Sequence, residues 1–122
     1  MLEPKSVREV QEAVNTASTA MLIRGGGTKT ALSTSSGNET VIDLSNLSGI
    51  LEYRPEEFTF TALSGTSLKN ITEMLSENGQ WLPFDPPMAK IGATIGGTLA
   101  TGLSGPGRYR FGGARDFVLG VE

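Results

Sequence analysis

The sequence predicts an α+β fold, and three observations lead to this prediction. Two amphipathic helical patterns, over residues 6–19 and 68–78, are separated by short apolar segments of strand type. The polar segment 30–40 stands where a doubly wound sheet would need a crossover helix, so that architecture is not expected. Half of the sixteen glycines fall between residues 91 and 113, which indicates close backbone approach in the last third of the chain.

Composition narrows the function before any motif is considered. The 122 residues suit one domain or part of one. The absence of cysteine and histidine excludes disulfides, thiolate or histidine metal sites and a Ser-His-Asp triad. No apolar run is long enough to cross a membrane, and no basic segment precedes an apolar one at the N-terminus. Neither a transmembrane segment nor a secretory signal is therefore predicted.

Charge is distributed unevenly along the chain. The net charge of −3 argues against a nucleic acid as partner. Residues 1–85 hold six basic and eleven acidic side chains, a balance of −5, whereas residues 86–122 hold four basic and two acidic ones, a balance of +2. The glycine-rich last third is thus the electropositive part, as an anionic ligand requires.

The first half is predicted to contain one helix and four strands. Ser6 and Glu9 have the spacing of a capping box, so the helix begins there. Its apolar residues recur at helical spacing; they are Val7, Val10, Val14 and Ala17. Phe58, Phe60 and Ala62 alternate with polar neighbours and predict one buried strand face. The expected strands are residues 21–24, 41–44, 49–53 and 58–63, with a turn at 54–57 and a loop at 30–40.

The second half is predicted to hold two helices and a final strand. Ser67 caps the first helix, and Gly79 stops it. Its core face is formed by Leu68, Ile71 and Leu75. Trp81 and Phe84 are expected in the core. A short helix over residues 93–100 has Thr94 as its N-cap, and residues 114–122 are expected to form an apolar strand.

The most informative motif is Arg24–Lys29, three glycines and a threonine between two cations. Glycines leave the backbone open, so several N–H groups can turn toward one anion, although an ordinary turn remains the alternative. The P-loop pattern fails because Thr28, not glycine, precedes Lys29-Thr30. The dinucleotide fingerprint fails because Thr30 replaces its third glycine and no helix follows. A second small-residue segment, residues 94–97, is expected to close on the same long, anionic, planar ligand.

Taken together, the glycine motifs resemble a known family. They are similar to the FAD-binding domain of the vanillyl-alcohol oxidase / p-cresol methylhydroxylase (PCMH) superfamily, and within it to the flavin-binding E subunits of bacterial glycolate oxidases. The matching segments are Ile23–Lys29, Phe84–Pro87, Ala93–Gly102, and Gly105–Arg108 with Arg115–Gly120. The resemblance implies the N-terminal part of a PCMH-type domain: a small βαβ-type subdomain with a mixed sheet over residues 1–84 and the start of a second α+β subdomain over 85–122. The remainder of the domain and a substrate domain are expected to lie outside this chain.

The resemblance implies FAD as cofactor, with residues 24–29 around its pyrophosphate and residues 92–104 reaching toward the flavin. Many members of the superfamily tether FAD through a histidine where Thr28 stands here, so FAD is expected to bind non-covalently. Arg115 and Asp116 are expected to form a partly buried ion pair. The expected cofactor-binding residues are Arg24, Gly25, Gly26, Gly27, Thr28, Lys29, Pro86, Gly92, Thr94, Gly96, Gly97 and Ser104.

The resemblance further implies a flavin-dependent oxidoreductase that takes a hydride from a small 2-hydroxy acid such as glycolate or D-lactate, this segment alone being inactive. Arg108 and Tyr109 are candidates for substrate contact, and no general base is identified. The expected partners are a second flavin subunit and an iron–sulfur subunit, in the cytoplasm or at the inner membrane through those subunits. Two alternatives stay open: a non-catalytic flavin-carrying subunit beside a catalytic homologue, and a protein like UDP-N-acetylenolpyruvoylglucosamine reductase, which matches fewer segments.

Overall fold

The structure, a computed structural model, describes all 122 residues and confirms the mixed helix and strand composition. The strands form two separate two-stranded sheets. In the first, β1 (Met21–Arg24) and β2 (Thr40–Asp43) run parallel, with Arg24 opposite Asp43. In the second, β3 (Ile50–Arg54) and β4 (Thr59–Ala62) run antiparallel around the short 3₁₀ turn η2 (Pro55–Glu57). Each strand expected in the first half is present, with ends within two residues of the predicted ones.

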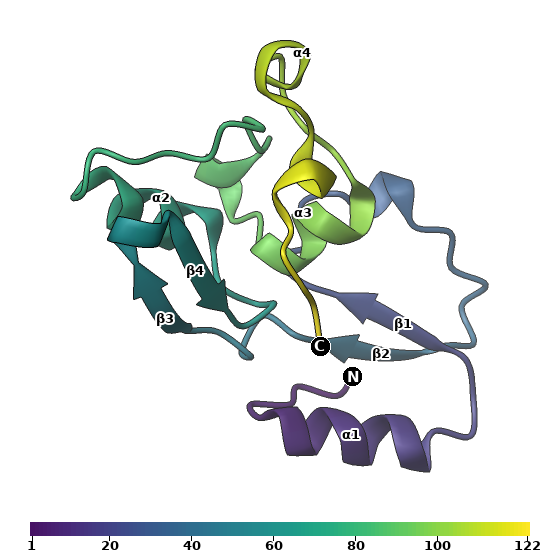
Figure 1. Ribbon diagram of the computed structural model, residues 1–122. Coiled ribbons are helices and arrows are strands. Elements are labelled where there is room, and N and C mark those ends of the chain that lie inside the picture. The colour runs from purple at the N-terminus through teal and green to yellow at the C-terminus, as the bar shows by residue number, and fades with distance from the viewer.

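Helices surround these two sheets. Figure 1 shows α1 (Val7–Thr16) and α3 (Ile95–Thr101) on opposite sides of the β1–β2 pair, and α2 (Leu68–Ser76) beside the β3–β4 hairpin. The remaining turns are η1 (Thr30–Leu32), η3 (Ala89–Ile91), α4 (Arg108–Phe111) and η4 (Ala114–Phe117). No helix has both the length and the apolar composition needed to cross a membrane.

Side-chain caps fix the ends of the main helices where the sequence predicts them. Ser6 Oγ accepts the Glu9 N–H at 3.2 Å, and Ser67 Oγ accepts the Asn70 N–H at 3.1 Å. Each bond satisfies a backbone donor that has no partner within the helix. Helix α1 stops at Thr16, earlier than the predicted residue 19, because Ala17 already has an extended backbone.

The hydrophobic core joins α2 to α3. Leu68 and Ile71 are fully buried on the inner face of α2. Phe60 and Ala62 of β4 pack against them as the alternation predicts. The buried cluster is completed by Leu75, Phe84, Ala93, Ile95 and Ala114. The core therefore holds α3, which carries the second small-residue segment, in a fixed place relative to the rest of the chain.

Two packing predictions and one strand prediction are wrong. Trp81 is 58% exposed and meets Phe111 edge to face, with ring centroids 5.0 Å apart, instead of entering the core. Phe58 is 80% exposed because it occupies a left-handed position, with φ of 56°, in the turn before β4. Residues 114–122 form the 3₁₀ turn η4 and an extended tail rather than a strand, since no other strand pairs with them.

Candidate functional site

The glycine loop that follows β1 lies directly against the segment before α3. A Cβ added to Gly26 would lie only 1.9 Å from the carbonyl oxygen of Gly92, and one added to Gly25 would lie 2.6 Å from Thr94 Oγ1. Gly27 has a φ of +66°, a conformation that residues with a Cβ rarely adopt. The two glycine segments singled out in the sequence are therefore in direct contact, and the first two glycines of the loop make that contact possible.

The same close approach recurs on α3. A Cβ on Gly96 would lie 2.8 Å from the Ser64 carbonyl oxygen, so a larger residue would push α3 away from the loop after β4. Thr94 Oγ1 accepts the Gly97 N–H at 3.2 Å and caps α3 as predicted. Glycines inside a helix cost about 1 kcal/mol each relative to alanine. Here the cost is compensated by the close packing that they allow.

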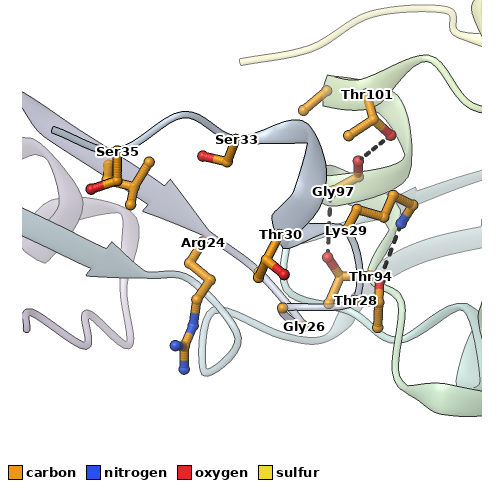
Figure 2. Close-up of a pocket in the computed structure, with 14 residues that line it drawn as sticks. Arg24, Gly26, Thr28, Lys29, Thr30, Ser33, Ser35, Thr94, Gly97 and Thr101 are labelled. Carbon is orange, nitrogen blue, oxygen red and sulfur yellow. Dashed lines mark hydrogen bonds between the residues drawn. The ribbon is translucent and has the colours of Figure 1, made fainter. Parts of the chain in front are cut away.

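Loop and helix enclose an open cleft of about 270 Å³. It is lined by residues 24–29 of the loop and by Thr94 and Gly97 at the start of α3 (Figure 2). The further lining residues are Leu22, Thr30, Ser33, Ser35, Ala100 and Thr101. Ala100 and Thr101 lie within residues 92–104, which were expected to reach toward the flavin, whereas Leu22, Thr30, Ser33 and Ser35 were not expected at the site. The density of serine and threonine in residues 30–40 is the sequence signal for the last three.

Backbone donors in the loop have no partners within the protein. None of the five N–H groups from Gly25 to Lys29 donates a hydrogen bond to another protein atom. Gly25, Thr28 and Lys29 are half-buried, and most such backbone donors in folded proteins are paired with protein, water or a ligand. Successive unpaired N–H groups beside a cleft can share one anion when they face it.

Arg24, one of the two cations of the loop, is paired within the fold. Its Nη2 and Nε lie 2.9 and 3.0 Å from Asp43 Oδ2, across the parallel register of β1 and β2. Hydrogen bonding from Ser45, together with the charge of Arg24, holds the pKa of buried Asp43 below its ordinary value despite desolvation. Figure 2 shows the guanidinium directed away from Lys29.

Lys29 is the other cation, and it has no carboxylate partner. No carboxylate oxygen lies within 4.0 Å of its Nζ, which donates to Thr28 Oγ1 at 3.3 Å. Its side chain is half-buried, and desolvation lowers its pKa from the ordinary 10.5. The positive charge that the cleft offers to a ligand is therefore mainly that of Lys29.

The loop beside the cleft is organised around Glu39. The carboxylate accepts hydrogen bonds from the Ser36 N–H at 2.7 Å, from the hydroxyls of Ser36 and Ser35 at 2.8 and 2.9 Å, and from the Gly37 N–H at 3.1 Å. These bonds, that of the Ser36 backbone first, lower the pKa of Glu39 to about 2. Because Ser35 also lines the cleft, Glu39 orders one of its edges.

Several expected residues lie outside the cleft lining. Gly92 contacts the loop at Gly26, and Gly96 packs closely against Ser64. Neither glycine lines the cleft, and neither do Pro86 and Ser104. Ser104 Oγ instead accepts the Ala114 N–H at 3.0 Å and fixes the start of η4. Arg108 and Tyr109, the candidates for substrate contact, lie on α4 and do not line the cleft.

The expected ion pair between Arg115 and Asp116 is absent. Both side chains are exposed, and no ion pair joins them. The Asp116 carboxylate accepts the Gly113 N–H at 2.8 Å and caps η4 instead. Adjacent side chains in such a turn point in different directions, so neighbours in the sequence do not necessarily form an ion pair.

Comparisons with known proteins identify relatives of the chain. All 122 residues match a family described as FAD binding domain. The glycolate oxidase subunit GlcE of Escherichia coli (strain K12) is 39% identical over 95% of this chain and 33% of that protein. A D-2-hydroxyglutarate dehydrogenase of Xanthomonas citri pv. viticola is 31% identical over 98% of this chain and 26% of that protein.

A solved structure shares the fold. An alkyldihydroxyacetonephosphate synthase superposes on 96% of this chain with a TM-score of 0.78 and 24% identity, over 23% of its own length. The chain thus spans about a third or less of the length of the relatives named here.

Replacing Gly26 with alanine is expected to push the loop away from Gly92 and so to lower the free energy of unfolding. The added Cβ would collide with the Gly92 carbonyl, and overpacking of this kind typically costs about 1–3 kcal/mol of unfolding free energy. Chemical denaturation would measure the loss. Gly120→Ala is the matched control, because nothing lies near the added Cβ there. Equal stabilities for the two variants would contradict the close approach.

The order of residues 35–39 is expected to depend on acid pH. Because folding lowers the pKa of Glu39 to about 2, its hydrogen bonds contribute fully above the ordinary value of 4.5 and are lost as the pH falls through about 2. Exchange of the Gly37 amide hydrogen, followed from pH 6 downward, would report the loss. The quantity to compare is the protection factor, the exchange rate of an unstructured chain at the same pH divided by the measured rate. Glu39→Gln should lower this factor at pH 6, and an unchanged factor in that variant would refute the role of the carboxylate.

Proposed function

The chain belongs to the FAD-binding domain family that it matches over its whole length, and on that premise we propose that the cleft binds the diphosphate of FAD. The run of five unpaired N–H groups from Gly25 to Lys29 is the observation that carries this proposal. A diphosphate offers several anionic oxygens, which such donors can share. A Cβ at Gly25 or Gly26 would clash with the opposite segment and disturb this arrangement.

Lys29 supplies the compensating charge in this proposal. Its ammonium has no carboxylate within the protein to neutralise it, and it stands beside the unpaired N–H groups. Arg24 contributes indirectly, since its ion pair with Asp43 fixes the end of β1 from which the loop departs. In this proposal Arg24 stabilises the fold, and Lys29 binds the ligand.

We propose that the cofactor is held without a covalent bond. The chain has neither histidine nor cysteine, and Thr28 lines the cleft where the superfamily resemblance places a tethering histidine. Bound FAD supplies the capacity to accept a hydride. The residues of this chain bind and orient it.

The relatives support a substrate class. Glycolate and D-2-hydroxyglutarate, in the names of two relatives, are both 2-hydroxy acids. We therefore propose that the protein serves the oxidation of a small 2-hydroxy acid, and that it works with partner subunits, as the word subunit in the name of the first relative suggests for that protein.

A second candidate is a flavin-carrying subunit that does not itself turn over substrate. Two relatives are named as different subunits of glycolate oxidase, GlcE of Escherichia coli and GlcD of Bacillus subtilis. Their names support a role in holding the flavin beside a homologous catalytic subunit. Anaerobic bleaching of bound flavin by glycolate in the isolated protein would decide for the enzyme.

The cofactor proposal is tested by an absorption spectrum of the purified protein, recorded before and after acid precipitation. We expect a flavin band that passes entirely into the acid supernatant. A band that stays with the precipitated protein would refute non-covalent binding, and the absence of flavin after reconstitution with FAD would refute the cleft as its site.

Lys29→Gln is expected to weaken FAD binding by roughly tenfold to a hundredfold, the range for loss of one charge-assisted hydrogen bond. Fluorescence titration of FAD would measure the change. Because desolvation lowers the pKa of Lys29, affinity in the unmodified protein should also fall as the pH rises toward that pKa. Lys69→Gln is the matched control, since Lys69 lies on α2 and is exposed. Equal affinities of the two variants would refute the role of Lys29.

A further inference from the structure

Lys29 differs from the other lysines of the chain in its surroundings. It lines the cleft, whereas the other three do not. Its side chain is half-buried, and no carboxylate oxygen lies within 4.0 Å of its Nζ. Lys69 Nζ, by contrast, lies 3.9 Å from a carboxylate oxygen of Glu73. Lys29 is therefore an amine that the fold holds in a cleft without a counter-charge. The other lysines are Lys5, Lys69 and Lys90.

The surroundings of Lys29 favour an anion. None of the residues that line the cleft is acidic. The backbone N–H groups from Gly25 to Lys29 donate to no other protein atom, and the last of them belongs to Lys29 itself. A phosphate group that these donors share therefore lies close to the residue that carries the amine.

The amine of Lys29 is also suited to act as a nucleophile. Only the neutral amine attacks a carbonyl carbon, and burial of a lysine favours that form over the ammonium. Desolvation lowers the pKa of Lys29 from the ordinary 10.5. The one hydrogen bond of its Nζ goes to Thr28 Oγ1 at 3.3 Å, an uncharged partner.

We propose that Lys29 is acylated by acyl phosphates while the cleft holds no cofactor. The phosphate end binds the loop N–H groups, which places the acyl carbon beside Nζ. As the amine attacks, the new N–C bond forms and the bond from the acyl carbon to the phosphate oxygen breaks. Inorganic phosphate leaves with the electron pair, and the nitrogen gives up one proton to phosphate or water. The product is a neutral amide, and no further reactant is required.

Acylation of Lys29 would regulate cofactor loading, a consequence that rests on the proposed binding of FAD in the cleft. The other cation of the lining, Arg24, is already paired with Asp43. Acylation therefore removes the one lining charge that has no carboxylate partner. The acylated protein should bind FAD as weakly as Lys29→Gln, and bound FAD should in turn cover the amine. A route that admits FAD also admits the smaller acyl phosphate.

The proposal is tested by treating the flavin-free protein with acetyl phosphate and measuring acetylation of each lysine by peptide mass spectrometry. N-hydroxysuccinimide acetate, an acetyl donor without phosphate, is the comparison reagent. We expect the ratio of Lys29 to Lys69 acetylation to be about tenfold or more higher with acetyl phosphate, because binding brings the reacting atoms together. Equal ratios with the two reagents would overturn the proposal.

Two controls show whether the folded cleft directs the reaction. Inorganic phosphate should suppress the acetylation of Lys29 by acetyl phosphate and leave that of Lys69 unchanged, since it competes for the loop N–H groups. In concentrated urea the preference for Lys29 should disappear, because the cleft is unfolded. A preference that survives in urea, or that inorganic phosphate does not reduce, would overturn the proposal.

FAD added before the reagent separates this proposal from that of the cofactor. Protection of Lys29 from acetyl phosphate by both FAD and inorganic phosphate supports the two proposals together. Protection by inorganic phosphate alone supports acylation and counts against FAD as the occupant of the cleft. If FAD protects Lys29 from N-hydroxysuccinimide acetate but acetyl phosphate shows no preference for this lysine, the acylation proposal is overturned and the cofactor proposal stands.

Discussion

The direct approach of two backbone segments, Gly25–Gly26 and Gly92–Thr94, is the constraint on which the rest of the structure depends. A side chain at either glycine would fill the space that the opposite segment occupies. The approach places the loop after β1 against the start of α3, and the core behind α3 keeps that helix from retreating. Packed interiors resist such displacement, so contact and cleft persist together. Packing elsewhere in the chain therefore keeps the unpaired N–H groups beside the cleft.

Electrostatics then distinguish two cations that look equivalent in the sequence. The parallel register of β1 and β2 sets Arg24 opposite Asp43, and their pairing satisfies a carboxylate that is almost fully buried. Leaving that carboxylate unpaired would be strongly unfavourable, so Arg24 stays in its ion pair with Asp43. Lys29 has no carboxylate partner in the protein. The difference arises from strand register, a long-range property, rather than from the loop itself.

Local patterns in the sequence predicted much of this molecule, and long-range contacts account for most of what they missed. Ser67 and Thr94 cap helices as expected because a cap depends on residues three positions apart. The pairing of Arg24 and the exposure of Trp81 depend on residues far along the chain, which no local pattern records. The tail after η4 has the composition of a strand, but a strand needs a partner, and none is present here. The contact between the two glycine segments was expected only as two sides of one ligand, not as direct packing.

The parallel pairing and the Gly26–Gly92 contact also have a consequence for synthesis. The loop leaves the ribosome long before the segment that completes the cleft, and in the interval its N–H groups are solvated by water. Because domains acquire long-range contacts late, a cleft made of two distant segments forms only after α3 has emerged. The complete cleft therefore does not exist until α3 has been synthesised and packed against the loop.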